Sequence, residues 1–272
     1  MALLADSVLP FGADGHLDLG AVRAHALWLL GSGIGGLVVG AGEVLHADRK
    51  EKERALDVVA DVAAGRPVIF PIWDPSPAYI VKLGRAAADR GVTAVLLPPP
   101  LVVPMSDDAL VDWFRSVAEH VTAPVLAWHH PRFGTPLSPR VLARLQAESR
   151  IAGWYDASGD AHRVRRLAEA WPGVGWTTID NGFAPEDLAS LAALPTLAGG
   201  VSALANAWPD LVKRAWDGRE PGLGDGLARR AATLERAGGI AALKRLLGVG
   251  ARLPIATVDA AEFTRLPPST FR

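Results

Sequence analysis

Acidic, basic and aromatic side chains follow the short apolar segments of this 272-residue chain. Imidazoles, carboxylates, a guanidinium and a phenol together suit proton transfer on a small substrate that is anionic or bears a carbonyl group. Such chemistry requires that the elements carrying these side chains bring them to one place. The candidate residues are Glu43, Trp73, Trp128, His129, His130, Arg132, Tyr155, Asp180 and Ser202.

The apolar segments alternate with longer segments of helical period, which predicts eight βα units. Eight near-continuous apolar strands favour a closed (β/α)8 TIM barrel over an open sheet. We expect residues 1–208 to form the barrel and residues 209–272 to form a C-terminal helical extension packed on it as one structural unit. Active sites of such barrels lie at the C-terminal ends of the strands. The expected strands are residues 3–9, 36–39, 67–72, 93–97, 124–128, 151–155, 174–179 and 196–201.

The composition excludes several classes of partner. Lys and Arg together number 28 against 29 Asp plus Glu, without long runs of one sign, which argues against nucleic acid and membrane surfaces. No segment approaches the roughly 20 apolar residues of a membrane span, and the N-terminus lacks a signal-peptide pattern, so we expect a cytoplasmic protein. We expect no cofactor and no metal, because cysteine is absent and no His-x-His or His-Glu-x-x-His spacing occurs.

Five short motifs appear in a recognisable order along the chain. They are Leu9-Pro10-Phe11 with Asp14-Gly15, Gly42-Glu43, the segment 124–131, Ala157-Ser158-Gly159-Asp160, and Gly200-Val201-Ser202 with Asn206. In this order they resemble the dihydrodipicolinate synthase / N-acetylneuraminate lyase family of (β/α)8 aldolases over nearly the whole length. The resemblance implies a homo-oligomer, either a dimer or a tetramer.

The catalytic residues implied by this resemblance differ here. The family forms a Schiff base between a lysine on its sixth strand and a 2-keto acid, and the aligned residue in this chain is Tyr155. A phenol cannot form an imine. Two family tyrosines fall on Trp128 and Leu101, and the carboxylate-binding pair falls on Gly40-Ala41. The five lysines of the chain lie on expected helices or at their starts, and none lies at an expected strand end.

Each candidate for acid/base work has a functional and a structural interpretation. Tyr155 would donate a hydrogen bond to a substrate oxygen or transfer a proton, or it would merely fill an inactive site. His129 and His130 are adjacent, so at most one should reach the pocket, and His130 shares the side of Trp128. Arg132 would clamp a carboxylate or would be an ordinary surface residue.

Further residues are expected to position the substrate. Backbone amides of Gly40, Ala41 and Gly42, and of Val201 and Ser202, would hold an anion. Trp73 and Trp128, with Leu101, would line a pocket more apolar than pyruvate requires. We expect a structural role for Glu43, which would hydrogen-bond its own loop, and an Asx turn with Gly182 for Asp180.

Three functional hypotheses follow. The leading one is a divergent enzyme that performs a lyase, aldol-type, hydratase or isomerase step by acid/base catalysis without a Schiff base. The second is a pseudoenzyme that binds a ligand or serves as a structural subunit. The third, ordinary dihydrodipicolinate synthase or N-acetylneuraminate lyase activity, is disfavoured by Tyr155. Convergence of Tyr155 and a histidine within hydrogen-bond reach of one enclosed cavity would favour the first hypothesis, and a collapsed mouth filled by tryptophan the second.

Overall fold

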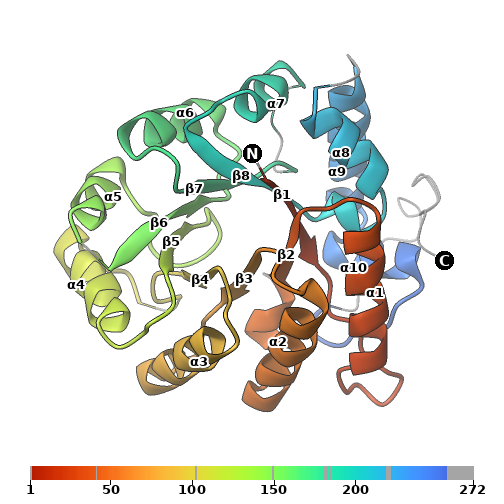
Figure 1. The fold of residues 1–272 in the computed structure, drawn as a ribbon, viewed down its shortest axis with the longest axis horizontal. Coiled ribbons are helices and arrows are strands. Elements are labelled where there is room, and N and C mark those ends of the chain that lie inside the picture. The colour runs from red at the N-terminus through yellow and green to blue at the C-terminus, as the bar shows by residue number, and fades with distance from the viewer. Residues whose placement is uncertain are drawn as a thin grey trace.

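The strands close into one parallel barrel in the order β1 to β8, with β1 paired to β8 (Figure 1). The structure is a computed structural model that describes residues 2–40, 42–101, 103–148, 150–180, 183, 185–218 and 222–255. The predicted TIM barrel is therefore confirmed. The strands are β1 (Ala2–Ser7), β2 (Gly36–Val39), β3 (Val68–Pro71), β4 (Ala94–Leu97), β5 (Val125–His129), β6 (Ile151–Asp156), β7 (Gly175–Thr178) and β8 (Leu197–Ser202).

A ring of helices covers the outside of the barrel. Several begin at a side chain that accepts a hydrogen bond from an amide of the first turn, as Asp18, Ser138 and Asp160 do. No helix of the described part of the chain is both long and apolar enough to cross a membrane. The helices of the ring are α1 (Leu19–Gly31), α2 (Arg49–Ala63), α3 (Pro77–Asp89), α4 (Asp107–Ala118), α5 (Pro139–Gln146), α6 (Ala161–Ala170), α7 (Pro185–Ala192) and α8 (Pro209–Trp216).

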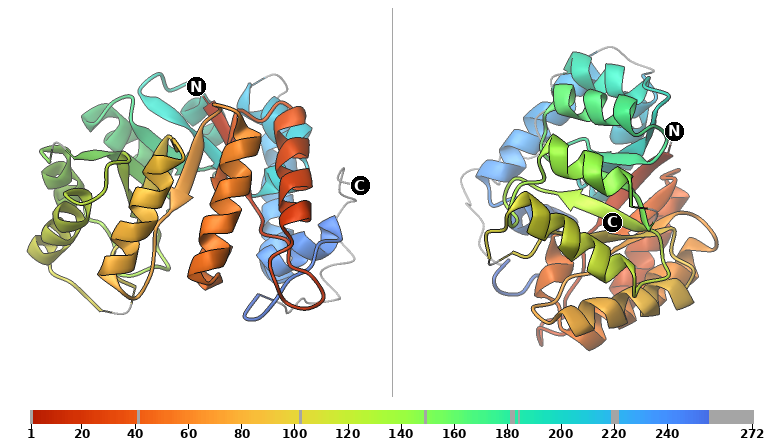
Figure 2. Two further views of the ribbon diagram at one scale, coloured as in Figure 1. Left: turned by 60° about the horizontal axis from the view of Figure 1, so that its bottom comes forward. Right: turned by 90° about the vertical axis from the view of Figure 1, so that its left-hand side faces the viewer.

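Helix α8 lies between α7 and α1 and so completes the ring (Figure 1). The expected division after residue 208 therefore falls between β8 and its own helix. The helices beyond the eight βα units are α9 (Leu223–Arg236) and α10 (Ile240–Leu247). Helix α10 lies at the end of the molecule opposite the N-terminus (Figure 2, left view). Short 3-10 helices, η1 (Glu43–His46) and η2 (Leu204–Asn206), follow β2 and β8.

Alternation along the strands separates two apolar cores. Side chains such as Leu4, Ile69 and Leu126 pack inside the barrel, and their neighbours in sequence pack between the strands and the helices. Gly199 makes room for the inward Trp176, because a Cβ atom there would lie 2.6 Å from the indole ring. The inner core thus fills the barrel below the strand ends.

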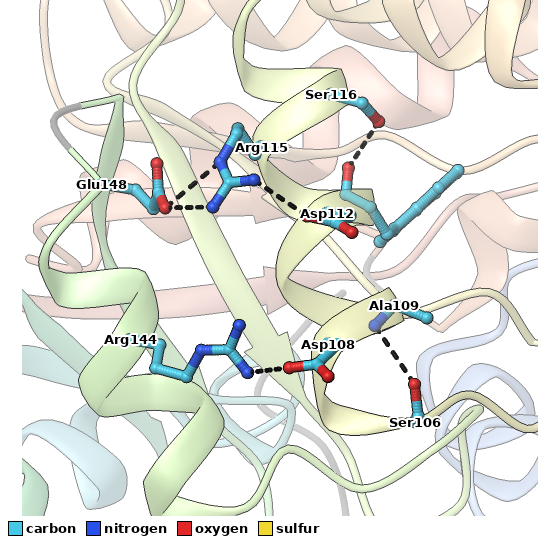
Figure 3. Close-up of polar contacts among 9 residues, drawn as sticks. Ser106, Asp108, Ala109, Asp112, Arg115, Ser116, Arg144 and Glu148 are labelled. Atoms are coloured by element: carbon cyan, nitrogen blue, oxygen red, sulfur yellow. Dashed lines mark hydrogen bonds and ion pairs between the residues drawn. The ribbon is translucent and has the colours of Figure 1, made fainter.

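Ion pairs join the helices on the outer surface, as Figure 3 shows for the α4–α5 region. Arg115 pairs with Glu148 at 2.7 Å, and Arg144 pairs with Asp108 at 2.6 Å. Exposed pairs of this kind stabilise a fold only slightly. Asp108 is one of the charged residues that these pairs place on the outer surface, remote from the barrel interior.

Candidate functional site

A cavity of about 480 Å³ opens at the C-terminal ends of the strands. Its floor and walls come from β1, β5, β6 and β7, and its rim comes from the end of α9 and the beginning of α10. A site at this end of the barrel agrees with the expected location. The residues with polar or aromatic side chains that line it are Asp6, Trp128, His130, Arg132, Phe133, Tyr155, Thr178, Asp180 and Glu235.

Tyr155 lies on the cavity floor, on the inward face of β6. Its side chain is 2% exposed, and its hydroxyl lies 2.9 Å from the Thr178 hydroxyl. Burial raises the pKa of Tyr155 above its ordinary value of 10, and the charges of Asp6 and Asp180 raise it further. The phenol therefore stays protonated at neutral pH and acts as a hydrogen-bond donor rather than as a base.

Asp180 follows β7 and projects to the same face as Thr178, two residues earlier. One carboxylate oxygen accepts from the Ser202 hydroxyl at 2.9 Å, and the other accepts from the Leu204 amide at 2.9 Å. Burial raises the pKa of Asp180 from 3.8 to about 6, because desolvation outweighs these hydrogen bonds. The carboxylate therefore links β7 to β8 and exchanges its proton near neutral pH. Gly182, the partner expected in an Asx turn, lies outside the described residues.

The two histidines occupy different sides of the chain. His130 lines the cavity, accepts a hydrogen bond from the Arg132 amide at 3.1 Å, and stacks on Phe133 with 4.0 Å between ring centroids. Burial, aided by the positive charge of Arg132, lowers the pKa of His130 to about 4, so the ring is neutral at pH 7. His129 ends β5 outside the cavity lining, where its Nδ1 accepts from the Leu137 amide at 3.2 Å. We leave His129 out of the catalytic group for this reason.

Aromatic rings form one wall of the cavity. Trp128 is 2% exposed and makes edge-to-face contacts with Phe133 at 5.4 Å and with Tyr155 at 6.1 Å. These offset geometries are the favourable ones for aromatic pairs. The indole N–H of Trp128 has no hydrogen-bond partner among the described residues. The wall does not fill the cavity, since the open space remains beside it.

Arg132 reaches the rim of the cavity rather than its floor. Its guanidinium pairs with Glu235 of α9 at 2.5 Å, and the two side chains are 71% and 59% exposed. The pair connects the segment after β5 to the helical extension. Arg132 therefore already holds a carboxylate of its own chain, at the position where a substrate carboxylate was expected.

Glu43 makes structural contacts, but to the loop after β1 and to α10 rather than within its own loop. Its carboxylate accepts from the Leu9 amide at 2.8 Å and from the Lys244 ammonium at 2.5 Å, and all three groups are buried. Lys244 also donates to the Leu9 carbonyl at 2.6 Å. Of the neighbouring loop, Gly42 lines the cavity, Gly40 donates its amide to Ser7, and Ala41 lies outside the described residues.

The other predicted pocket residues lie beneath or beside the cavity. Trp73 and Leu101 are half-buried against the inner core, and Val201 is fully buried in it. Ser202 is also buried and supports Asp180 through its hydroxyl. None of these four is among the described residues that line the cavity.

The lysines lie on helices, as expected, and two of them reach loops at strand ends with their side chains. Lys244 of α10 contacts the loops after β1 and β2, and Lys52 of α2 donates to the Trp73 carbonyl at 2.9 Å. Both ammonium groups are engaged, and neither lysine is among the described residues that line the cavity. None of the eight strands contains a lysine.

Four of the polar or aromatic lining residues were absent from the sequence prediction. The inward orientation of Asp6 could have been predicted from alternation along β1, because Asp6 shares the inward face of this largely apolar strand with Leu4. Thr178 lies two residues before Asp180 and shares its face. Phe133 and Glu235 have no local signal, since tertiary packing alone brings them to the rim.

Comparison with known proteins assigns the barrel to a family. Residues 2–224 match the Dihydrodipicolinate synthetase family. The chain belongs to this family. It is 32% identical over 209 residues to a 4-hydroxy-tetrahydrodipicolinate synthase of Methanothrix thermoacetophila, covering 74% of this chain and 68% of that protein. It is 31% identical over 261 residues to an uncharacterized DapA-like lyase of Halobacterium salinarum, covering 93% and 83%.

Solved structures of the dihydrodipicolinate synthetase family and of sialic acid aldolase share the fold. The 4-hydroxy-tetrahydrodipicolinate synthase of Methylacidiphilum fumariolicum SolV superposes with a TM-score of 0.84 at 22% identity, covering 97% of this chain and 92% of that one. A catalytic-lysine mutant of the sialic acid aldolase of Ruminococcus gnavus gives 0.84 at 14% identity, covering 96% and 92%. The protein is thus a member of a lyase family within the aldolase superfamily.

Proposed function

We propose that this protein catalyses a lyase, aldol-type, hydratase or isomerase step on a small carbonyl compound by acid/base catalysis, without a Schiff base. The observation that carries the proposal is the group on the cavity floor: a protonated phenol, Tyr155, beside Asp180, whose pKa of about 6 suits proton exchange at neutral pH. These kinds of step share one requirement, which is proton transfer next to a carbonyl.

The proposed chemistry divides between these two groups. In an isomerase or hydratase step, the Asp180 carboxylate accepts a proton from the carbon next to the substrate carbonyl. In a lyase or aldol-type cleavage it accepts the proton of a hydroxyl one carbon further on, and the bond between these two carbons breaks to leave a new carbonyl and an enolate. Tyr155 donates a hydrogen bond to the carbonyl oxygen, where negative charge develops as the enolate forms. The protonated Asp180 then returns the proton to carbon, or to a departing hydroxyl group. His130, neutral at pH 7, supplies a second hydrogen-bonding group at the wall.

A Schiff base would need a free amine at the cavity. The sialic acid aldolase of Ruminococcus gnavus is a related fold with a catalytic lysine, and this chain has Tyr155 on β6 with no lysine on any strand. The nearest amines at strand ends, Lys52 and Lys244, are held by a carbonyl and by Glu43. Both observations favour acid/base chemistry over ordinary synthase or aldolase activity.

One observation favours the alternative of a catalytically inactive ligand-binding protein. Both oxygens of Asp180 already accept hydrogen bonds, and the Tyr155 hydroxyl contacts Thr178 rather than His130. In that case the same cavity would bind the ligand without turnover. A homo-oligomeric state, as a dimer or tetramer, and a cytoplasmic location remain predictions from the sequence.

Hydrogen exchange tests the proposal without knowledge of the natural substrate. The protein is incubated in D2O with dihydroxyacetone and, separately, with pyruvate, and loss of the carbon-bound hydrogens is followed by proton NMR. We expect protein-dependent exchange on at least one compound, abolished in Asp180→Asn and retained in Asp108→Asn, the same substitution on the outer surface. Equal background rates for all three proteins would favour the binding-protein alternative.

A further inference from the structure

The charges around the cavity are unsuited to an anionic ligand. Asp180 is held by a hydroxyl and an amide rather than by a cation. Asp6 and Asp180 both line the cavity, and the charges of both raise the pKa of Tyr155 on its floor. A ligand carboxylate at this floor would face like charge.

In the part of the chain that the structure describes, the rim supplies no unpaired positive charge. Arg132 is the one Lys or Arg among the described lining residues, and Glu235 neutralises it at 2.5 Å. Lys244, on the helix that borders the rim, is neutralised by Glu43. A substrate carboxylate would have to break one of these pairs before it gained a cation.

The lining favours hydroxyl-rich ligands instead. Trp128 and Phe133 present apolar ring surface at one wall, against which the C–H groups of a polyol can pack. The hydroxyls of Tyr155 and Thr178 and the carboxylate of Asp180 lie at the floor and offer both donors and acceptors. A ligand ammonium group would, in addition, be attracted by the carboxylates at the floor.

We infer that the cavity accepts a polyhydroxylated carbonyl compound that is uncharged or carries an amino group, in preference to a 2-keto acid or another carboxylate. This inference deepens the proposed function, because it names the substrate class for the same cavity. It departs from the expectation of an anionic substrate, because that expectation relied on Arg132 and on loop amides being free.

Three hexoses of one skeleton test the inference: glucosamine, glucose and glucuronate, which are cationic, neutral and anionic at pH 7. Their dissociation constants are measured by calorimetry at low and moderate salt with wild type, Asp180→Asn, Asp6→Asn and Asp108→Asn. We expect glucosamine to bind about tenfold more tightly than glucuronate, with a difference that shrinks in salt. Each cavity variant should reduce the ratio, whereas Asp108→Asn should leave it unchanged.

Several results would overturn the inference. Glucuronate binding as tightly as glucosamine is one, and a ratio unaffected by both cavity variants is another. Absence of binding by all three sugars would also overturn it. Because no turnover is measured, these outcomes are separate from the hydrogen-exchange result: a protein that exchanges hydrogen on carbonyl compounds but prefers glucuronate would retain the proposed function and lose this substrate class.

Discussion

At the scale of single residues, environment rather than residue type decides the roles at the cavity. Tyr155 and Asp180 both have raised pKa values for the same principal reason, which is burial. The consequences differ, because a phenol with a raised pKa is only a donor, while a carboxyl group with a pKa of about 6 can give or take a proton near pH 7. His130, with its pKa lowered to about 4, is excluded as a neutral-pH acid.

Asp180 should make stability and activity depend on pH in opposite directions. The pKa of Asp180 is about 6 in the folded protein, above its ordinary value of 3.8. Its contribution to the free energy of unfolding is therefore complete below pH 3.8 and is lost as the pH rises through about 6. Across this range we expect the free energy of unfolding of wild type to fall by about 2–3 kcal/mol relative to Asp180→Asn. Urea titrations of both proteins at several pH values measure the difference, whereas exchange activity should rise with pH through about 6. A constant offset between the two proteins would contradict the assignment.

Tyr155→Phe should separate hydrogen-bond donation from packing. The ring is retained, so we expect a loss of stability of about 1 kcal/mol and a fall of about 100-fold in the hydrogen-exchange rate, expressed mainly in kcat. Thr178→Val removes the partner hydroxyl but leaves the donor, so its effect on kcat should be smaller. Equal rates for Tyr155→Phe and wild type would assign Tyr155 a structural role only.

At the scale of elements, the strands and the presence of C-terminal helices were predictable, and the placement of those helices was not. Apolar alternation and turn residues located all eight strands to within a few residues, and with them the face that carries Trp128 and Tyr155. The placement of α9 and α10 depends on contacts between residues roughly a hundred or two hundred positions apart, such as Arg132 with Glu235 and Glu43 with Lys244. No local pattern encodes those pairs, so the rim of the cavity and the occupied state of Arg132 could not be anticipated.

The buried pair of Glu43 and Lys244 should fasten α10 to the loop after β2. Replacing Lys244 with Met leaves Glu43 buried without its counter-charge, and we expect a loss of about 3–5 kcal/mol in the free energy of unfolding. The double variant Glu43→Gln/Lys244→Met should recover part of this loss. Chemical denaturation of the three proteins checks the prediction, and a double variant less stable than Lys244→Met would show that charge burial is not the cause.

The exposed pair of Arg132 and Glu235 should affect which ligand charge the cavity prefers rather than the free energy of unfolding. Glu235→Gln frees the guanidinium at the rim, so we expect glucuronate to bind several-fold more tightly while the free energy of unfolding changes by less than about 1 kcal/mol. Calorimetry and urea titration measure the two effects on one sample. Unchanged glucuronate affinity would mean that Arg132 does not contribute to the field in the cavity.

At the scale of the whole molecule, the protein has the barrel of the dihydrodipicolinate synthetase family and carries Tyr155 of β6 in the lining of its cavity. Its fold superposes with a TM-score of 0.84 on proteins at 14–22% identity, so the architecture tolerates extensive substitution. Fold alone therefore does not specify the chemistry. The cavity itself, with a phenol on β6 and carboxylates on the floor, is the basis for the proposed activity.

The measurement that tests this account most directly is intact-mass analysis after incubation with a carbonyl compound and borohydride. Wild type, Lys52→Met, Lys244→Met and Tyr155→Lys are each treated with pyruvate and with dihydroxyacetone. We predict no adduct on wild type or on either lysine variant, and a reduced-imine adduct on Tyr155→Lys, which would show that the cavity admits the carbonyl and lacks only the amine. An adduct on wild type that disappears in Lys52→Met or Lys244→Met would contradict the central claim, because the protein would then form a Schiff base from a lysine on a helix.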